Sequence, residues 1–67
     1  MITLTINGDN HTFENEIALS ELLKQIGLDP KKVAVERNLE IVPKSQFNIQ
    51  NIKNNDSLEI VHFIGGG

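Results

Sequence analysis

The sequence predicts an α+β fold in which one helix lies across one face of a small sheet. Apolar residues recur with a period of two near both ends of the chain, which is typical of half-buried strands. Between these ends, one segment repeats apolar residues with the period of a helix. At 67 residues, the chain is expected to form one domain with little room for an internal pocket, so a self-contained enzyme is not expected.

The first hairpin is predicted at the beginning of the chain. Residues 2–6 alternate between aliphatic residues and threonine, which indicates a strand with one buried face. Asn7-Gly8 follows and favours a tight turn, because both residues tolerate a positive φ. A second strand is expected around residues 11–13, with Phe13 as its core anchor.

A helix is predicted between Leu19 and Gly27. Its apolar face has the spacing i, i+3, i+4 and i+7 and consists of Leu19, Leu22, Leu23 and Ile26. Ser20 is the candidate N-cap, because its hydroxyl can accept a backbone N–H, and Leu19 then lies just outside the helix as a staple-like residue. Gly27 is expected to end the helix in the left-handed conformation, and Asp29-Pro30 keeps the helix from resuming.

Several short elements are predicted after the helix. Residues 33–35 and 39–42 are interpreted as apolar strands, and Pro43 ends the second of them. Residues 44–55 are expected to form a polar loop with one helical turn or a short strand. The apolar anchors of this loop are Phe47, Ile49 and Ile52. Residues 58–64 form the most apolar strand, which we place beside the first strand at the centre of the sheet.

Three consecutive glycines, Gly65-Gly66-Gly67, directly follow the last predicted strand. At an average glycine content of about 7%, such a run at one fixed place is expected roughly 3 times in 10,000. A tail without side chains can enter a narrow enzyme site, and three extended residues carry the terminal carboxylate about 10 Å beyond the strand. We therefore divide the chain into a folded domain, residues 1–64, and a flexible tail, residues 65–67.

The composition disfavours several classes of function. The chain has no cysteine, so it has no disulfide, thiol nucleophile or thiolate metal site. Its net charge is −3 and its cations are dispersed apart from Lys31-Lys32, so nucleic-acid binding is not expected. His11 and His62 are interpreted as surface residues rather than metal ligands. With no signal-peptide pattern or membrane span, we expect a soluble cytoplasmic protein.

The order of these features resembles the ubiquitin-like superfamily, and more narrowly the small sulfur carrier proteins of thiamine biosynthesis. The resemblance covers nearly the whole chain and implies a β-grasp fold, with one helix on one face of a mixed sheet. The matching segments are Asn7-Gly8, Leu22-Leu23, residues 33–38, Ile41-Val42-Pro43, residues 56–61 and the terminal glycines.

Two positions depart from the pattern of this family. Asn55-Asp56 stands where the family usually has Gly-Asp, but asparagine also tolerates the left-handed conformation, so we expect the turn to form. Ala18 stands where the family tends to have a threonine cap, so we expect the start of the helix to be less well satisfied.

The resemblance implies a reaction at the C-terminus of Gly67. A partner enzyme uses ATP and Mg²⁺ to adenylate this carboxylate, and sulfur supplied through a cysteine desulfurase then displaces AMP. The resulting thiocarboxylate donates sulfur to a thiazole synthase. In this scheme the chain is not an enzyme and binds no cofactor or metal itself.

A docking face is also expected beside the tail. If Leu58 faces the helix, alternation places Val61 and Phe63 on the uncovered face of the sheet, where exposed apolar residues often mark partner surfaces. An alternative is that Phe63 covers the sheet edge or folds back on Phe47. The expected partner-binding residues are Val61, Phe63, Ile64, Gly65 and Gly66.

Three other functions remain open at this point. The chain could hand sulfur to molybdopterin, since carriers of that kind share the fold and the glycine end. It could be a protein modifier that is joined to lysines of its targets. It could also be a binding module with an inert tail. Fold and tail do not separate these functions.

Overall fold

The computed structural model describes residues 1–63, and the predictions for Ile64 and for the glycine tail lie outside this part of the chain. The main sheet has five strands in the order β2-β1-β7-β4-β5, and a second sheet pairs β3 with β6. In chain order, the elements are β1 (Ile2–Ile6), β2 (Asp9–Phe13), β3 (Ile17–Ala18), α1 (Leu19–Gln25), the 3₁₀ turn η1 (Pro30–Lys32), β4 (Val33–Arg37), β5 (Glu40–Ile41), the 3₁₀ turn η2 (Lys44–Gln46), β6 (Asn51–Ile52) and β7 (Ser57–His62).

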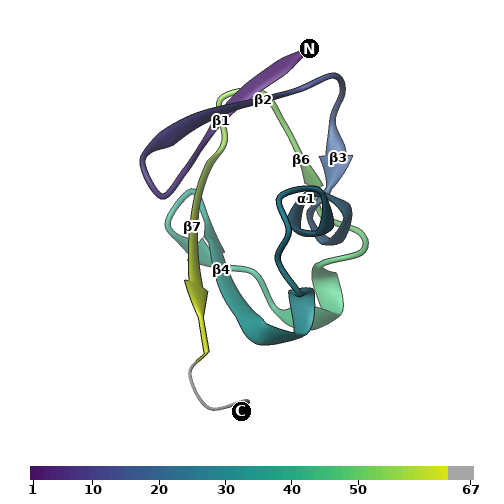
Figure 1. Cartoon of the computed structure of the whole chain (residues 1–67), viewed down its shortest axis with the longest axis vertical. Coiled ribbons are helices and arrows are strands. Elements are labelled where there is room, and N and C mark those ends of the chain that lie inside the picture. The colour runs from purple at the N-terminus through teal and green to yellow at the C-terminus, as the bar shows by residue number, and fades with distance from the viewer. Residues whose placement is uncertain (64–67) are drawn as a thin grey trace.

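The last strand occupies the centre of the main sheet next to the first, as predicted. β7 pairs in parallel with β1 and antiparallel with β4, so the sheet is mixed. The pairing with β4 extends from Val33 opposite His62 to Arg37 opposite Leu58. The strand is offset from its predicted range, because it begins at Ser57 and ends at His62. Its end points away from the N-terminus, toward the opposite end of the molecule (Figure 1).

One helix packs against one face of this sheet, and the predicted apolar face of the helix is confirmed (Figure 1). Leu19, Leu22 and Leu23 are fully buried, and Ile26 is half-buried against the same cluster. The sheet contributes alternate residues to this core, as the period of two requires. These residues are Ile2, Leu4, Ile6, Val33, Val35 and Leu58. Phe13, the expected anchor of the second strand, packs against the core while remaining partly exposed.

The helix ends are satisfied differently at its two termini. The prediction of Ser20 as N-cap is wrong, because the helix begins at Leu19 and its N-cap is Ala18, which supplies no side-chain bond. Instead, the Leu19 N–H donates to the Gln50 carbonyl and the Ser20 N–H to the Phe47 carbonyl, each at 2.9 Å. A distant segment therefore caps the helix. At the other end, Gly27 has a φ of +85°, as predicted.

The segment after Pro43 contains both a helical turn, η2, and a short strand, β6, which pairs with the short strand β3 just before the helix. Phe47 and Ile52 are buried anchors, as expected. Ile49 is not an anchor: it is 68% exposed, because the tight turn after η2 directs this position outward. The sequence did not predict β3, which has only two residues and no alternation to reveal it.

The strand expected over residues 39–42 is shorter than predicted. Leu39 lies in the turn between β4 and β5, with a φ of +70°, and only Glu40 and Ile41 pair with β4. The positive φ at Asn38 and Leu39 matches the right-handed twist of the two strands, which is why the turn takes this form. Asn55 has a φ of +71°, so the left-handed turn expected at this position is confirmed.

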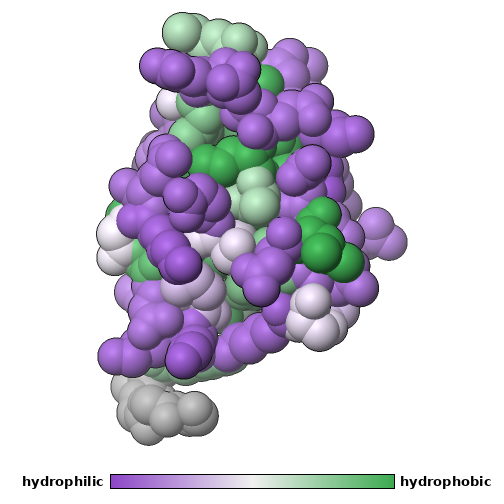
Figure 2. Space-filling model, turned by 90° about the vertical axis from the view of Figure 1, so that its right-hand side faces the viewer, coloured by the Kyte–Doolittle hydropathy of each residue, from purple (hydrophilic) through white to green (hydrophobic). Residues whose placement is uncertain are grey.

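The side of the molecule that carries the helix is largely hydrophilic, with scattered hydrophobic residues (Figure 2). This side lies opposite the face of the sheet that no helix covers. No helix within residues 1–63 is long and apolar enough to cross a membrane.

Candidate functional site

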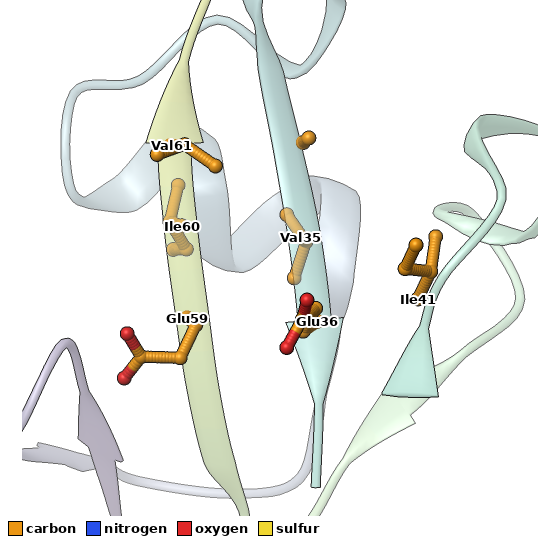
Figure 3. Close-up of a pocket in the computed structure, with 7 residues that line it drawn as sticks. Val35, Glu36, Ile41, Glu59, Ile60 and Val61 are labelled. Atoms are coloured by element: carbon orange, nitrogen blue, oxygen red, sulfur yellow. The ribbon is translucent and has the colours of Figure 1, made fainter. Parts of the chain in front are cut away.

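An apolar groove runs across the uncovered face of the main sheet (Figure 3). Its volume is about 330 Å³, and it lies over β7, β4 and β5. Val61 is 65% exposed and stands opposite Ala34, while Ile41 is 75% exposed on the neighbouring edge strand. Scattered exposed apolar residues are ordinary, but here they come together from three adjacent strands on one face. This arrangement is typical of a surface that binds another protein.

Two acidic side chains interrupt this groove. Glu36 on β4 stands directly opposite Glu59 on β7, and Ile41 pairs with Glu36 on its other side. Like charges directly opposite one another destabilise a sheet, so this pair does not serve the fold. A partner that fits this face would combine apolar side chains with a cation near the two carboxylates.

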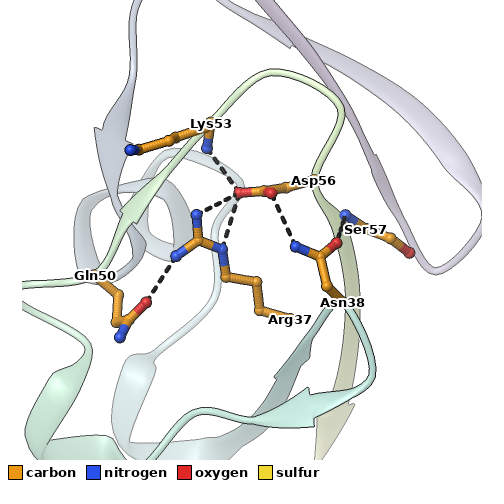
Figure 4. A network of polar contacts seen from close by, with 6 residues as sticks. All are labelled: Arg37, Asn38, Gln50, Lys53, Asp56 and Ser57. Atoms are coloured by element: carbon orange, nitrogen blue, oxygen red, sulfur yellow. Dashed lines mark hydrogen bonds and ion pairs between the residues drawn. The ribbon is translucent and has the colours of Figure 1, made fainter.

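A network centred on Asp56 fixes the strands beneath the groove (Figure 4). Asp56 is 8% exposed, and its carboxylate accepts from the Arg37 guanidinium at 2.8 and 2.9 Å, from the Asn38 amide at 3.0 Å and from the Lys53 N–H at 2.8 Å. The Asn38 side chain also accepts the Ser57 N–H at 2.9 Å. The turn after β4 is thereby joined to the start of β7.

The pKa of Asp56 lies below its usual range because opposing effects do not cancel. Burial alone raises the pKa of this carboxyl, since it disfavours the charged form. The hydrogen bonds from Lys53, Asn38 and Arg37, together with the charge of Arg37, lower the pKa by more. Asp56 is therefore an anion that the folded protein stabilises.

The described chain ends beside the two 3₁₀ turns. The Phe63 N–H donates to the Lys32 carbonyl at 2.9 Å, and the Lys44 Nζ lies 4.6 Å from the centre of the Phe63 ring. Phe63 remains 44% exposed despite these contacts, and it is not among the residues that line the groove. In the sequence, Ile64 and the three glycines follow Phe63, outside the described residues.

Comparisons with known proteins identify the family of this chain. A sequence model of the ThiS family matches residues 4–67. The chain belongs to the ThiS family. The sulfur carrier protein ThiS of Bacillus subtilis is 37% identical over 96% of this chain and 98% of its own length. The resemblance to sulfur carriers of thiamine biosynthesis is therefore confirmed.

A crystal structure confirms the fold of the family. The thiamine biosynthesis protein ThiS of Geobacter metallireducens superposes with a TM-score of 0.84, at 30% identity over 98% of this chain and 100% of its own. The fold is therefore the β-grasp fold that the sequence predicted.

Two longer relatives contain a region similar to this chain. They are named thiazole synthase, from Paramagnetospirillum magneticum and Magnetococcus marinus, and are 52% and 42% identical over 96% and 92% of this chain. The chain spans about a fifth of their length.

The expected site residues fall into three groups. Val61 lies in the groove, whereas Phe63 packs against Lys44 and does not line it. Ile64 and the three glycines, including Gly67 with its predicted reaction, lie outside the described residues. Sequence reasoning missed Ile41 and Ala34, which reach the groove only through strand pairing. Their alternation with buried Val35 and Val42 was the one available signal.

The histidines do not form a metal site with other residues of the described chain. Within residues 1–63, no three His, Asp or Glu side chains are grouped so that they could hold a metal ion. The absence of a bound cofactor therefore stays a prediction.

We expect Asp56→Asn to destabilise the domain by about 2 kcal/mol at neutral pH, because the bonds to a charged acceptor are lost. The folded-state pKa of Asp56 is depressed, so its contribution is complete above the ordinary carboxyl pKa of about 4 and disappears as the pH falls below it. Urea titrations of both proteins between pH 7 and pH 2 should show the difference shrinking toward low pH. Glu14→Asn, which removes an exposed carboxylate, should not cause such a pH-dependent difference in the free energy of unfolding. A difference that stays constant with pH would contradict the role of the Asp56 charge.

Proposed function

We propose that this chain carries sulfur for the formation of thiazole in thiamine biosynthesis. Membership of the ThiS family, with a relative named sulfur carrier protein that matches over nearly its whole length, carries the proposal. The three terminal glycines of the sequence supply the end that such chemistry needs. In this proposal the chain is a co-substrate of other enzymes rather than an enzyme.

The proposed chemistry takes place at the carboxylate of Gly67. A carboxylate is a poor acyl donor, because oxide is a bad leaving group. An adenylating partner joins the carboxylate to AMP from ATP, with Mg²⁺, and releases pyrophosphate. A persulfide formed by a cysteine desulfurase then attacks the acyl carbon and displaces AMP. A thiol reduces the resulting acyl disulfide, which releases the thiocarboxylate on Gly67 and leaves a disulfide between the two thiols. The chain contributes the carboxylate, a tail that fits a narrow site and a docking face.

The proposed sulfur acceptor is a thiazole synthase. Two similar proteins that bear this name contain a region related to the present chain, which supports an association between the carrier and the synthase. Neither the family nor these names favour molybdopterin as the acceptor, and we therefore propose the thiamine route.

Intact mass spectrometry tests the proposal. The purified chain is incubated with an adenylating enzyme known to act on another ThiS protein, ATP, Mg²⁺ and a sulfide source. We expect the mass to change by replacement of one terminal oxygen with sulfur. An unchanged mass, while the other ThiS protein reacts in the same mixture, would overturn the proposal.

An alanine added after Gly67 should reduce adenylation by at least about 100-fold, because a displacement of the carboxylate by even 1 Å removes it from the reacting geometry. Pyrophosphate release measures the rate. The matched control carries the extra alanine after Met1, and we expect it to react at the normal rate and to show the same melting temperature. Equal rates for the two extended proteins would show that a free Gly67 terminus is not required.

The groove should contribute to docking of the adenylating partner. We expect Val61→Asp to weaken binding roughly 10-fold or more, because it places a charge among apolar contacts and beside two acidic residues. Thr12→Asp is the matched control: it adds the same charge on the same sheet face, on the far edge strand, where Thr12 pairs with Thr3. Calorimetric titration measures both affinities. Equal affinities would mean that the partner does not use the groove.

A further inference from the structure

Phe63, the last residue that the structure describes, is held at both its backbone and its side chain. The Phe63 N–H bonds to the Lys32 carbonyl of η1 at 2.9 Å. The ammonium group of Lys44, from η2, donates to the Lys31 carbonyl at 2.8 Å and lies over the Phe63 ring, 4.6 Å from its centre. One lysine therefore joins the two 3₁₀ turns to the last described residue of the chain.

The position of the Lys44 ammonium is specific rather than a general attraction to nearby acids. Asp29 lines the same surface hollow as Lys31 and Lys44, yet the one ion pair within residues 1–63 joins Arg37 to Asp56. The Asp29 side chain instead accepts the Lys31 N–H at 2.9 Å and so fixes η1. Lys44 is thus directed to a carbonyl and an aromatic face, an arrangement that favours a cation.

We propose that Lys44 is a positioning residue for the reactive terminus, and that it acts by holding Phe63 against η1. This inference rests on the proposed function. The position of Phe63 is then fixed, and the four residues that follow it in the sequence can span about 14 Å at most. Without Lys44, Phe63 is released from η1, and the carboxylate is less concentrated where a docked partner needs it.

Kinetics of adenylation test the inference. Lys44→Met removes the ammonium but keeps an unbranched side chain of nearly the same length, and we expect it to raise KM about 2- to 10-fold with little change in kcat. Lys44→Arg retains a cation and a donor and should restore KM. Lys53→Met removes the same charge from the loop before β7, at the other end of that strand, and should leave KM unchanged. An unchanged KM in Lys44→Met would overturn the inference.

A double-mutant cycle separates positioning from direct contact of Lys44 with the partner. If Lys44 acts through the Phe63 ring, Lys44→Met should have no further effect on KM in a Phe63→Leu background. Additive effects of the two substitutions would show that Lys44 acts on the partner itself, and would also overturn the inference.

A spectroscopic measurement keeps this inference distinct from the proposed function. In the free protein, the ring of Phe63 should shift the ε-methylene protons of Lys44 upfield, and the Phe63 amide should be protected from exchange with water. Lys44→Met should lose the amide protection and Lys44→Arg should keep it. If the chain is never adenylated, the proposed function fails. Protection of the Phe63 amide that does not depend on Lys44 disproves the positioning role of Lys44, whether or not adenylation occurs.

Discussion

The hydrogen-bonded anion of Asp56 is the interaction on which the placement of the other elements depends. Its side chain reaches Arg37 and Asn38 at the end of β4, while its backbone carbonyl accepts the Thr5 N–H of β1 at 3.0 Å. Asp56 thus holds together the two strands between which β7 runs. A domain of this size has a small core and a small margin of stability, so a nearly buried charge is tolerated only because all its partners are present.

The two faces of the main sheet differ in what covers them. One face packs against α1 and borders the core, whereas the other bears the groove with Val61, Ala34 and Ile41. On the second face, the opposed carboxylates of Glu36 and Glu59 lower the stability of the sheet, because they carry like charges. Because the core and the groove share the same strands, packing of the core also fixes the backbone that lines the groove. The end of β7 then sets the place where the terminal glycines begin.

The sequence was informative wherever a repeating pattern extended over several residues. The alternation in β1 and β7, the helical spacing of Leu19, Leu22 and Leu23, and the left-handed positions of Gly27 and Asn55 were all predicted. Each depends on neighbours in the chain. The glycine run and the resemblance to sulfur carrier proteins were also visible in the sequence, because both depend only on the order of residues.

Features that depend on distant parts of the chain could not be predicted in this way. The start of the helix is capped by carbonyls of Phe47 and Gln50, so no local hydroxyl acts as the N-cap and the prediction of Ser20 is wrong. Leu39 was read as a strand residue because leucine is apolar, but the hairpin geometry requires a positive φ there. Ile41 reaches the groove only through strand pairing, and Lys44 reaches Phe63 only through packing. No local sequence pattern predicts either contact.

The central claim is that the terminal residue carries sulfur as a free thiocarboxylate. The most direct measurement is fragmentation mass spectrometry of the intact chain isolated from cells that are starved of thiamine. The account predicts fragments in which one oxygen of Gly67 is replaced by sulfur, and no change elsewhere. Gly67 found only as an unmodified carboxylate, or joined through an amide bond to lysines of other proteins, would contradict it.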